Sequence, residues 1–199
     1  MRRTVAILLF DEVEVLDFAG PFEVFAVTDE LAQAERFRVL TVAAERRAIR
    51  ARNGLSVNPD HALADCPPVD ILIVPGGFGT RTLLKDQPVL AWIKTVNRTA
   101  EIVASVCTGA LVLGAAGLLD GLRVTTHHEA FDLLREHAPR ATVVESGRFV
   151  DNGRILTAGG ISAGIDMALH LVARLYDVPT AQQTARYMEY HPSAEIFSS

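Results

Sequence analysis

Cys107 has the sequence context of a reactive thiol. It lies in segment 105–110, where an apolar run gives way to Thr108-Gly109-Ala110. A cysteine at a sharp turn from a strand into a helix stands clear of the sheet, and the free N–H groups of the helix face its sulfur. We therefore expect the pKa of the Cys107 thiol to be lowered, which increases the fraction of nucleophilic thiolate.

Two other segments supply groups that would assist such a thiol. Asp17, in segment 16–21, can hydrogen-bond the sulfur or transfer a proton if burial or a thiolate raises its pKa. Gly76 and Gly77, in segment 75–79, can donate backbone N–H groups to a developing negative charge. Together the three segments predict a nucleophilic active site for a small molecule.

Each of these features also has a plain structural explanation. A lone cysteine between a strand and a helix is often a small buried hydrophobe. A Pro-Gly-Gly sequence after a strand is ordinarily a turn, and Asp17 could cap a helix. The combination favours the active site, because all three segments follow expected strands.

The elements that position these segments alternate along the chain. Apolar runs predict strands over residues 5–10, 37–43, 70–74, 102–106, 123–126, 142–145, 149–150 and 154–157, with a hairpin over 47–59 that turns at Asn53-Gly54. Helices are expected from Gly20-Pro21 onward and over 89–97, 109–118, 129–136, 161–176 and 180–190. This order predicts an α/β protein, a three-layer α-β-α sandwich whose mostly parallel sheet binds ligands at its carboxyl edge.

The bulk properties narrow the class of protein. With 199 residues, one domain over 1–199 is expected. The net charge of −5 argues against a nucleic-acid or anionic-membrane partner. We interpret the arginines at 46, 47, 50 and 52 as the solvent-exposed face of the hairpin. Two cysteines make no disulfide framework and no Cys/His cluster suits a metal, so we expect a metal-free cytoplasmic protein. The uncharged run 102–119 contains three glycines and lacks a basic anchor, which favours a strand and a helix over a membrane span.

Five segments together resemble the ThiJ/PfpI superfamily, which has the class I glutamine amidotransferase-like (flavodoxin-like) fold. They are residues 16–21, 74–77, 106–110, 125–127 and 157–166, so the resemblance spans nearly the whole chain. Within the superfamily the sequence is most similar to isonitrile hydratases and to the sensory halves of certain AraC-type regulators. The resemblance implies a homodimer with no metal or organic cofactor.

The resemblance to isonitrile hydratases implies a role for three residues. Cys107 would attack the isonitrile carbon, Asp17 would serve as acid and base, and Thr108 would be the hydroxyl residue beside the nucleophile. The product of such a lyase would be an N-substituted formamide, formed through a cysteine thioimidate. A carboxylate with both roles needs a pKa near neutrality, which partial burial can provide.

The same resemblance implies which residues would bind the substrate: Gly76, Gly77, Phe78, His127 and His128. Many relatives carry His-Trp where this chain has His127-His128, so the pocket wall should be smaller and more polar. His127 is as compatible with a structural role at a strand end as with one in the pocket.

Other functions remain open on the sequence. PfpI-like proteases place a histidine after the cysteine, and Thr108 in that position disfavours them. Glutamine amidotransferases use a later His and Glu, but His191 and Glu195 follow the last expected helix. A glyoxalase or deglycase would use the same cysteine near an acid. A non-enzymatic small-molecule or redox sensor would bind its ligand or be oxidised at Cys107 without turnover.

Overall fold

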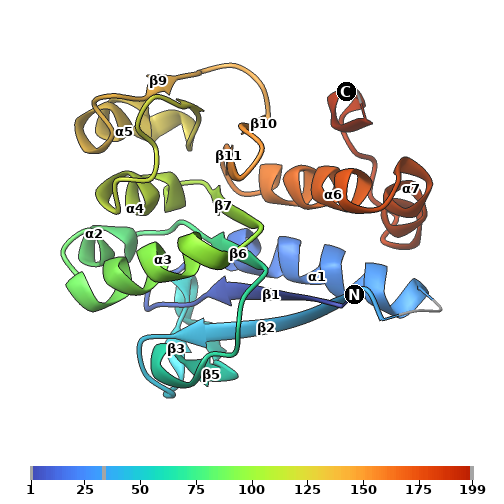
Figure 1. Cartoon of the computed structure of the whole chain (residues 1–199), viewed down its shortest axis with the longest axis horizontal. Coiled ribbons are helices and arrows are strands. Elements are labelled where there is room, and N and C mark those ends of the chain that lie inside the picture. The colour runs from blue at the N-terminus through green and yellow to red at the C-terminus, as the bar shows by residue number, and fades with distance from the viewer. Residues whose placement is uncertain (1, 33–34, 198–199) are drawn as a thin grey trace.

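A seven-stranded sheet forms the centre of the molecule (Figure 1). The computed structural model describes residues 2–32 and 35–197. Along the sheet the strand order is β10-β11-β7-β6-β1-β2-β5, and every neighbouring pair is parallel except β10 with β11. The strands are β1 (Arg3–Leu8), β2 (Phe37–Ala43), β5 (His61–Ala62), β6 (Ile71–Val74), β7 (Ile102–Val106), β10 (Phe149–Asp151) and β11 (Ile155–Ala158).

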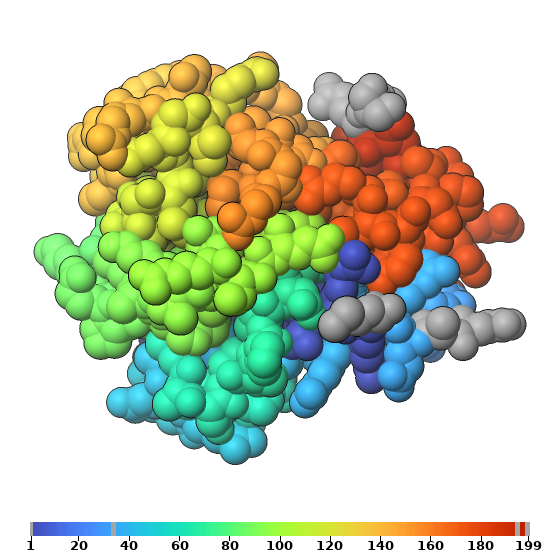
Figure 2. Space-filling view, in the orientation of Figure 1, coloured from blue at the N-terminus to red at the C-terminus, as the bar shows by residue number. Residues whose placement is uncertain are grey.

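Two groups of helices complete the three-layer sandwich that the sequence predicts. Helices α1 (Val15–Leu31), α6 (Ala163–Leu175) and α7 (Val178–Tyr187) pack on one another, and Figure 2 shows the orange-to-red C-terminal helices lying against the blue N-terminal segment. The other group is α2 (Thr80–Leu83), α3 (Gln87–Thr99), α4 (Gly109–Ala115) and α5 (Phe131–His137). Strands β1, β6 and β7 are buried almost throughout, as strands covered on both faces should be.

The smaller elements follow the sequence prediction in part. The predicted hairpin is confirmed, with β3 (Ile49–Arg50) antiparallel to β4 (Ser56–Val57) and with Asn53 and Gly54 at positive φ in its turn. Strands β8 (Arg123–Val124) and β9 (Thr142–Val143) pair in a separate parallel sheet. The 3-10 turns of the described residues, which the sequence did not predict, are η1 (Arg52–Gly54), η2 (Leu63–Asp65), η3 (His128–Ala130) and η4 (Ala194–Phe197).

The prediction that Gly20-Pro21 opens the first helix is wrong. Helix α1 begins at Val15, so Pro21 lies inside it and Asp17 lies in its first turn. The two residues serve packing against α6 instead: a Cβ at Gly20 would lie 2.9 Å from the Ile165 side chain, and a Cβ at Gly164 would lie 3.5 Å from Pro21. The close approach of two helices therefore explains a sequence signal that we assigned to a helix start.

The uncharged run 102–119 divides into strand β7 and helix α4, as expected. Helix α4 ends at Ala115, three residues before the predicted end. Among the residues that the structure describes, no helix has the length and apolar character needed to cross a membrane.

The register of the central strands brings the predicted segments to one edge of the sheet. Val74 of β6 pairs with Ser105 of β7, and Val106 of β7 pairs with Ala158 of β11. The residues that follow these strands therefore emerge side by side at their carboxyl ends. Cys107 follows β7 there, between the neighbouring strands β6 and β11.

Gly109 allows α4 to start directly against the end of β6. A Cβ on Gly109 would lie 2.0 Å from the carbonyl oxygen of Val74 and 2.9 Å from that of Pro75. Both contacts are with backbone, which cannot rotate away as a side chain would. The turn that carries Cys107 thus depends on the missing side chain at this position.

We expect Gly109→Ala to lower the free energy of unfolding by at least about 2 kcal/mol, because the methyl group must push the start of α4 away from the end of β6. Gly153→Ala is the matched control, since Gly153 has a φ of 83° but nothing within 4 Å of its Cβ position. Its cost should be only the backbone strain of about 1 kcal/mol. Urea unfolding measures both variants, and equal losses of stability would contradict the steric argument.

Candidate active site

Cys107 occupies a strained backbone conformation at the sharp turn after β7. Its φ is 57°, in the left-handed region that non-glycine residues seldom adopt, and its side chain is buried. The Cys107 N–H donates to the carbonyl oxygens of Ala158 (3.1 Å) and Gly159 (2.9 Å). The Thr126 hydroxyl donates to the Cys107 carbonyl over 2.7 Å. Three hydrogen bonds therefore hold the conformation that strain alone would disfavour.

Asp17 is fully buried beside this turn. Its Oδ2 atom accepts a hydrogen bond from the Gly76 N–H over 2.9 Å, and its Oδ1 atom has no hydrogen-bond partner among the described residues. Burial, with a smaller contribution from the charge of Glu14, raises the pKa of Asp17 to about 7, although hydrogen bonds from the Gly76 N–H and the Cys107 thiol oppose the increase. The carboxyl group therefore titrates near neutral pH, as an acid-base group should.

The prediction that the pKa of Cys107 is lowered is wrong. Burial, together with the neighbouring charge of Asp17, raises the pKa of this thiol to about 12, although the Thr108 N–H opposes the increase. Helix α4 has only seven residues, so its N-terminus does not outweigh burial beside a carboxylate. Above pH 7 the pair holds a thiol and a carboxylate, and Asp17 can accept the thiol proton as sulfur attacks.

The glycine N–H groups that we expected to face a substrate are already bonded within the protein. The Gly76 N–H donates to Asp17, and the Gly77 N–H donates to the Thr108 hydroxyl over 3.0 Å. The prediction that they are free donors is therefore wrong. Thr108 is brought to the site as predicted, but its hydroxyl bonds Gly77 and lies 3.4 Å from that of Thr80. Its hydroxyl fixes the glycine loop against the Cys107 turn.

A cavity of about 310 Å³ opens over Cys107. Of the predicted substrate-binding residues, Gly77, Phe78 and His127 line it. Phe78 is more than half exposed at its mouth. Further lining residues, which the sequence reasoning did not select for the site, come from the start of α1, the hairpin turn, α2, η3 and the loop before α6: Glu14, Arg52, Asn53, Arg81, Glu129, Ala130 and Ile161.

The two adjacent histidines have different positions. His127 lines the cavity over Cys107, and burial lowers its pKa, so it is neutral at pH 7. Gly160 makes room for its ring, since a Cβ there would lie 2.3 Å from the His127 Cδ2 atom. His128 stacks on His127 with ring centroids 4.4 Å apart, but it lines a neighbouring cavity instead. The structure does not bring His128 to the Cys107 cavity as predicted.

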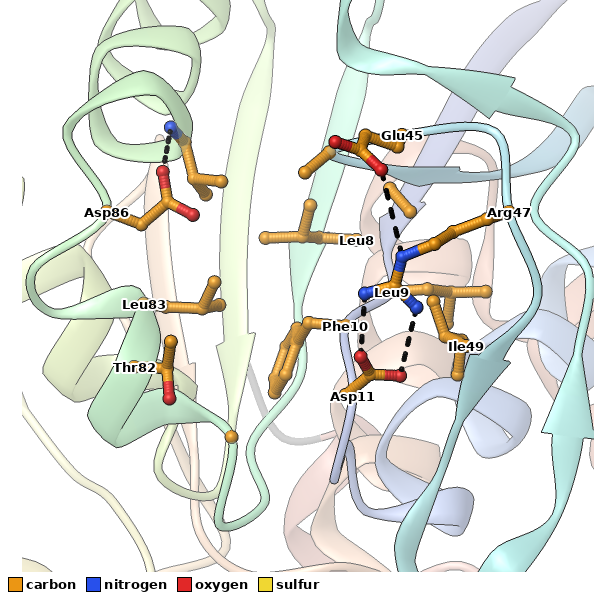
Figure 3. A pocket seen from close by; sticks show the side chains of 14 residues that line it. Leu8, Leu9, Phe10, Asp11, Glu45, Arg47, Ile49, Thr82, Leu83 and Asp86 are labelled. Carbon is orange, nitrogen blue, oxygen red and sulfur yellow. Dashed lines mark hydrogen bonds and ion pairs between the residues drawn. The ribbon is translucent and has the colours of Figure 1, made fainter.

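A separate cavity of about 350 Å³ lies at the carboxyl ends of β1 and β2 (Figure 3). Leu8, Phe10 and Leu83 form part of its wall, and an ion pair between Asp11 and Arg47 lies at one side. It contains none of the predicted site residues and no cysteine or histidine. The chemistry therefore centres on Cys107, and the part of the chain that the structure describes holds no cluster of three metal-binding side chains.

The fold agrees with the comparisons with known proteins. The DJ-1/PfpI family model matches residues 3–174, and the chain belongs to this family. It is 39% identical to the isonitrile hydratase of Pseudomonas putida over 97% of this chain and 81% of that protein.

Two further proteins mark the range of the family. The HTH-type transcriptional regulator CdhR of Pseudomonas aeruginosa is 34% identical over 89% of this chain, which spans about half (52%) of the regulator's length. A ThiJ/PfpI family protein from Pseudomonas syringae superposes with a TM-score of 0.87 at 29% identity, over 97% of this chain and 77% of that one. The family therefore includes both enzymes and regulators.

We expect Asp17 to make the protein less stable as pH rises from about 4 to about 7. Its pKa is 3.8 ordinarily and about 7 in the folded protein, so over this interval the folded state binds more protons than the unfolded state. The linked loss of stability is about 4 kcal/mol, which Asp17→Asn should remove. Urea unfolding of both proteins at pH 5 and pH 8 measures the part of this loss that falls between the two pH values, about 2.6 kcal/mol. The same pH dependence in both would show that Asp17 is not the titrating group.

Proposed function

We propose that this protein is a cysteine-dependent lyase that hydrates an isonitrile to an N-substituted formamide. The observation that carries the proposal is the buried pair of Cys107 and Asp17 beneath a cavity large enough for a small organic molecule. The similarity to isonitrile hydratase over nearly the whole chain supports the choice of reaction. Cys107 would be the nucleophile, Asp17 the acid and base, and Thr108 a positioning residue.

In the first step the Cys107 sulfur forms a bond to the terminal carbon of R–N≡C. Asp17, as carboxylate, takes the thiol proton while the bond forms. The lone pair on the former isonitrile carbon then takes this proton from Asp17, which gives the thioimidate R–N=CH–S–Cys107. The pKa of Asp17, about 7, suits both transfers, because the group accepts and returns one proton at neutral pH.

In the second step water adds to the thioimidate carbon. Asp17 takes one proton of the water and passes it to the nitrogen, which leaves a tetrahedral R–NH–CH(OH)–S–Cys107. Collapse of this intermediate forms the carbonyl and breaks the carbon–sulfur bond, and Asp17 carries the hydroxyl proton to the leaving sulfur. The products are R–NH–CHO and the free thiol, so one water is consumed for each isonitrile.

The thiol environment favours this enzyme over a redox sensor on the same fold. Oxidation to sulfenic acid starts from an exposed thiolate, and susceptibility follows both exposure and thiolate character. Cys107 is buried and its pKa is raised to about 12, so it is a neutral thiol when no substrate is bound. A thiol that loses its proton only during attack suits turnover.

Formamide production from cyclohexyl isocyanide tests the proposal. Cys107→Ala should abolish turnover, and Asp17→Asn should lower kcat about 10²–10⁴-fold, because proton transfer to and from the reacting atoms is lost. Cys66→Ala is the matched control, since Cys66 lies outside the cavity, and it should retain wild-type turnover. Folded wild-type protein that converts no isonitrile across a panel of alkyl and aryl compounds would overturn the assignment.

The rate should depend on pH through Asp17. We expect kcat/KM for the isonitrile to rise with pH, with a midpoint near 7, and then to level off, because the reaction starts from thiol and carboxylate. The residual activity of Asp17→Asn should lack this midpoint. A rate that falls as pH rises through 7 would mean that the protonated carboxyl group starts the reaction.

A further inference from the structure

Arg81 presents an uncompensated positive charge at the mouth of the Cys107 cavity. Its Nη1 atom donates to the Gly77 carbonyl (3.3 Å) and the Thr80 hydroxyl (3.2 Å), both neutral acceptors. Among the described residues, no carboxylate lies within ion-pair distance of its guanidinium group. The remaining N–H groups of the planar guanidinium are not used by these contacts, and they suit a carboxylate.

Arg52 lines the same cavity and differs from Arg81 in one respect. Its Nε atom is 3.6 Å from the Glu14 carboxylate, which compensates its charge. Both guanidinium groups lie near the Phe78 ring, with Cζ atoms 4.0 Å (Arg52) and 5.5 Å (Arg81) from its centroid. Phe78 therefore orders two cations beside the entrance, and only one of them has an acidic partner.

The other charged groups near the cavity do not cancel the charge of Arg81. Glu129 also lines the cavity, but its side chain is largely in solvent, and the described ion pairs place it within 3.9 Å of the neutral His127 ring and not within ion-pair distance of Arg81. Asp17 is fully buried and hydrogen-bonded to Gly76. A ligand with a negative group at the mouth would thus gain an ion pair with Arg81 without displacing an existing one.

We propose that the substrate is an isonitrile that carries a carboxylate, with its isonitrile carbon at Cys107 and its carboxylate at Arg81. This inference rests on the proposed function and names the substrate class of the same site. A cavity of about 310 Å³ accommodates a small molecule with both groups. Hydration would yield an N-formyl amino acid, and the carboxylate would take no part in bond making or breaking.

Paired substrates test the proposal. An isocyano carboxylate and its neutral amide share one carbon skeleton, and wild-type protein should prefer the carboxylate in kcat/KM. Arg81→Ala should lower the ratio of the two kcat/KM values at least about tenfold, because one charge-assisted, two-pronged contact is lost. Arg81→Lys should give an intermediate ratio, since lysine keeps the charge without the planar fork.

The control is Arg98→Ala, which removes a positive charge from an exposed position near the end of α3. It should leave the ratio unchanged, so a general effect of net charge is distinguished from a contact at the mouth. A carboxylate preference that persists in Arg81→Ala, or a wild-type preference for the amide, would overturn the proposal. A structural defect in Arg81→Ala would lower both rates together and leave the ratio as it was.

Binding to an inactive protein separates this proposal from the proposed function. In Cys107→Ala, calorimetry with an N-formyl amino acid and with its amide should show tighter binding of the carboxylate. The added substitution Arg81→Ala should remove that difference. If the difference appears while no isonitrile is hydrated, the carboxylate site stands and the lyase assignment fails; if both ligands bind equally, the carboxylate site fails whatever the turnover.

Discussion

The left-handed conformation of Cys107 is the constraint on which the rest of the site depends. A positive φ is energetically unfavourable for a residue with a side chain. At Cys107 this cost is offset by hydrogen bonds to the Ala158 and Gly159 carbonyls and from the Thr126 hydroxyl. The turn is also crowded, because a Cβ at Gly76 would lie 2.8 Å from that of Cys107. Strand ends, glycines and Thr126 therefore act together to place one sulfur atom.

The position of Asp17 depends on a different set of contacts, at the packing of α1 against α6. Gly20 and Pro21 bring α1 close to α6, and this fixes the first turn of α1 beneath the cysteine. Burial there is what raises the pKa of Asp17. The acid-base property of the site is thus a consequence of helix packing, and a carboxylate in the same chemical role on an exposed loop would titrate well below neutrality.

The fold could be predicted from the sequence because buried parallel strands are continuous apolar runs and turns carry glycine or proline. Cys107 and Asp17 could be selected for the same reason, since both follow expected strands. Arg81 could not, because it lies on a short helix, α2, that no periodicity reveals. The prediction that the Gly76 and Gly77 N–H groups are free was wrong, because a sequence shows which donors a loop carries but not which acceptors lie near them. The prediction of a lowered pKa for the Cys107 thiol was wrong for a similar reason, since burial beside a carboxylate depends on three-dimensional packing.

The reacting groups of the site are buried and the groups at the cavity mouth are partly exposed, and this separation has a physical reason. The reacting groups need a low-dielectric surrounding and a fixed geometry, which only the buried ends of the central strands provide. The groups at the mouth, Phe78 with Arg52 and Arg81, come from the hairpin turn and the start of α2 and are partly in water. We therefore expect substitutions there to change which molecule enters while the strained turn beneath keeps its conformation. Proteins similar to this chain include an isonitrile hydratase and a transcriptional regulator, so the same fold serves more than one function.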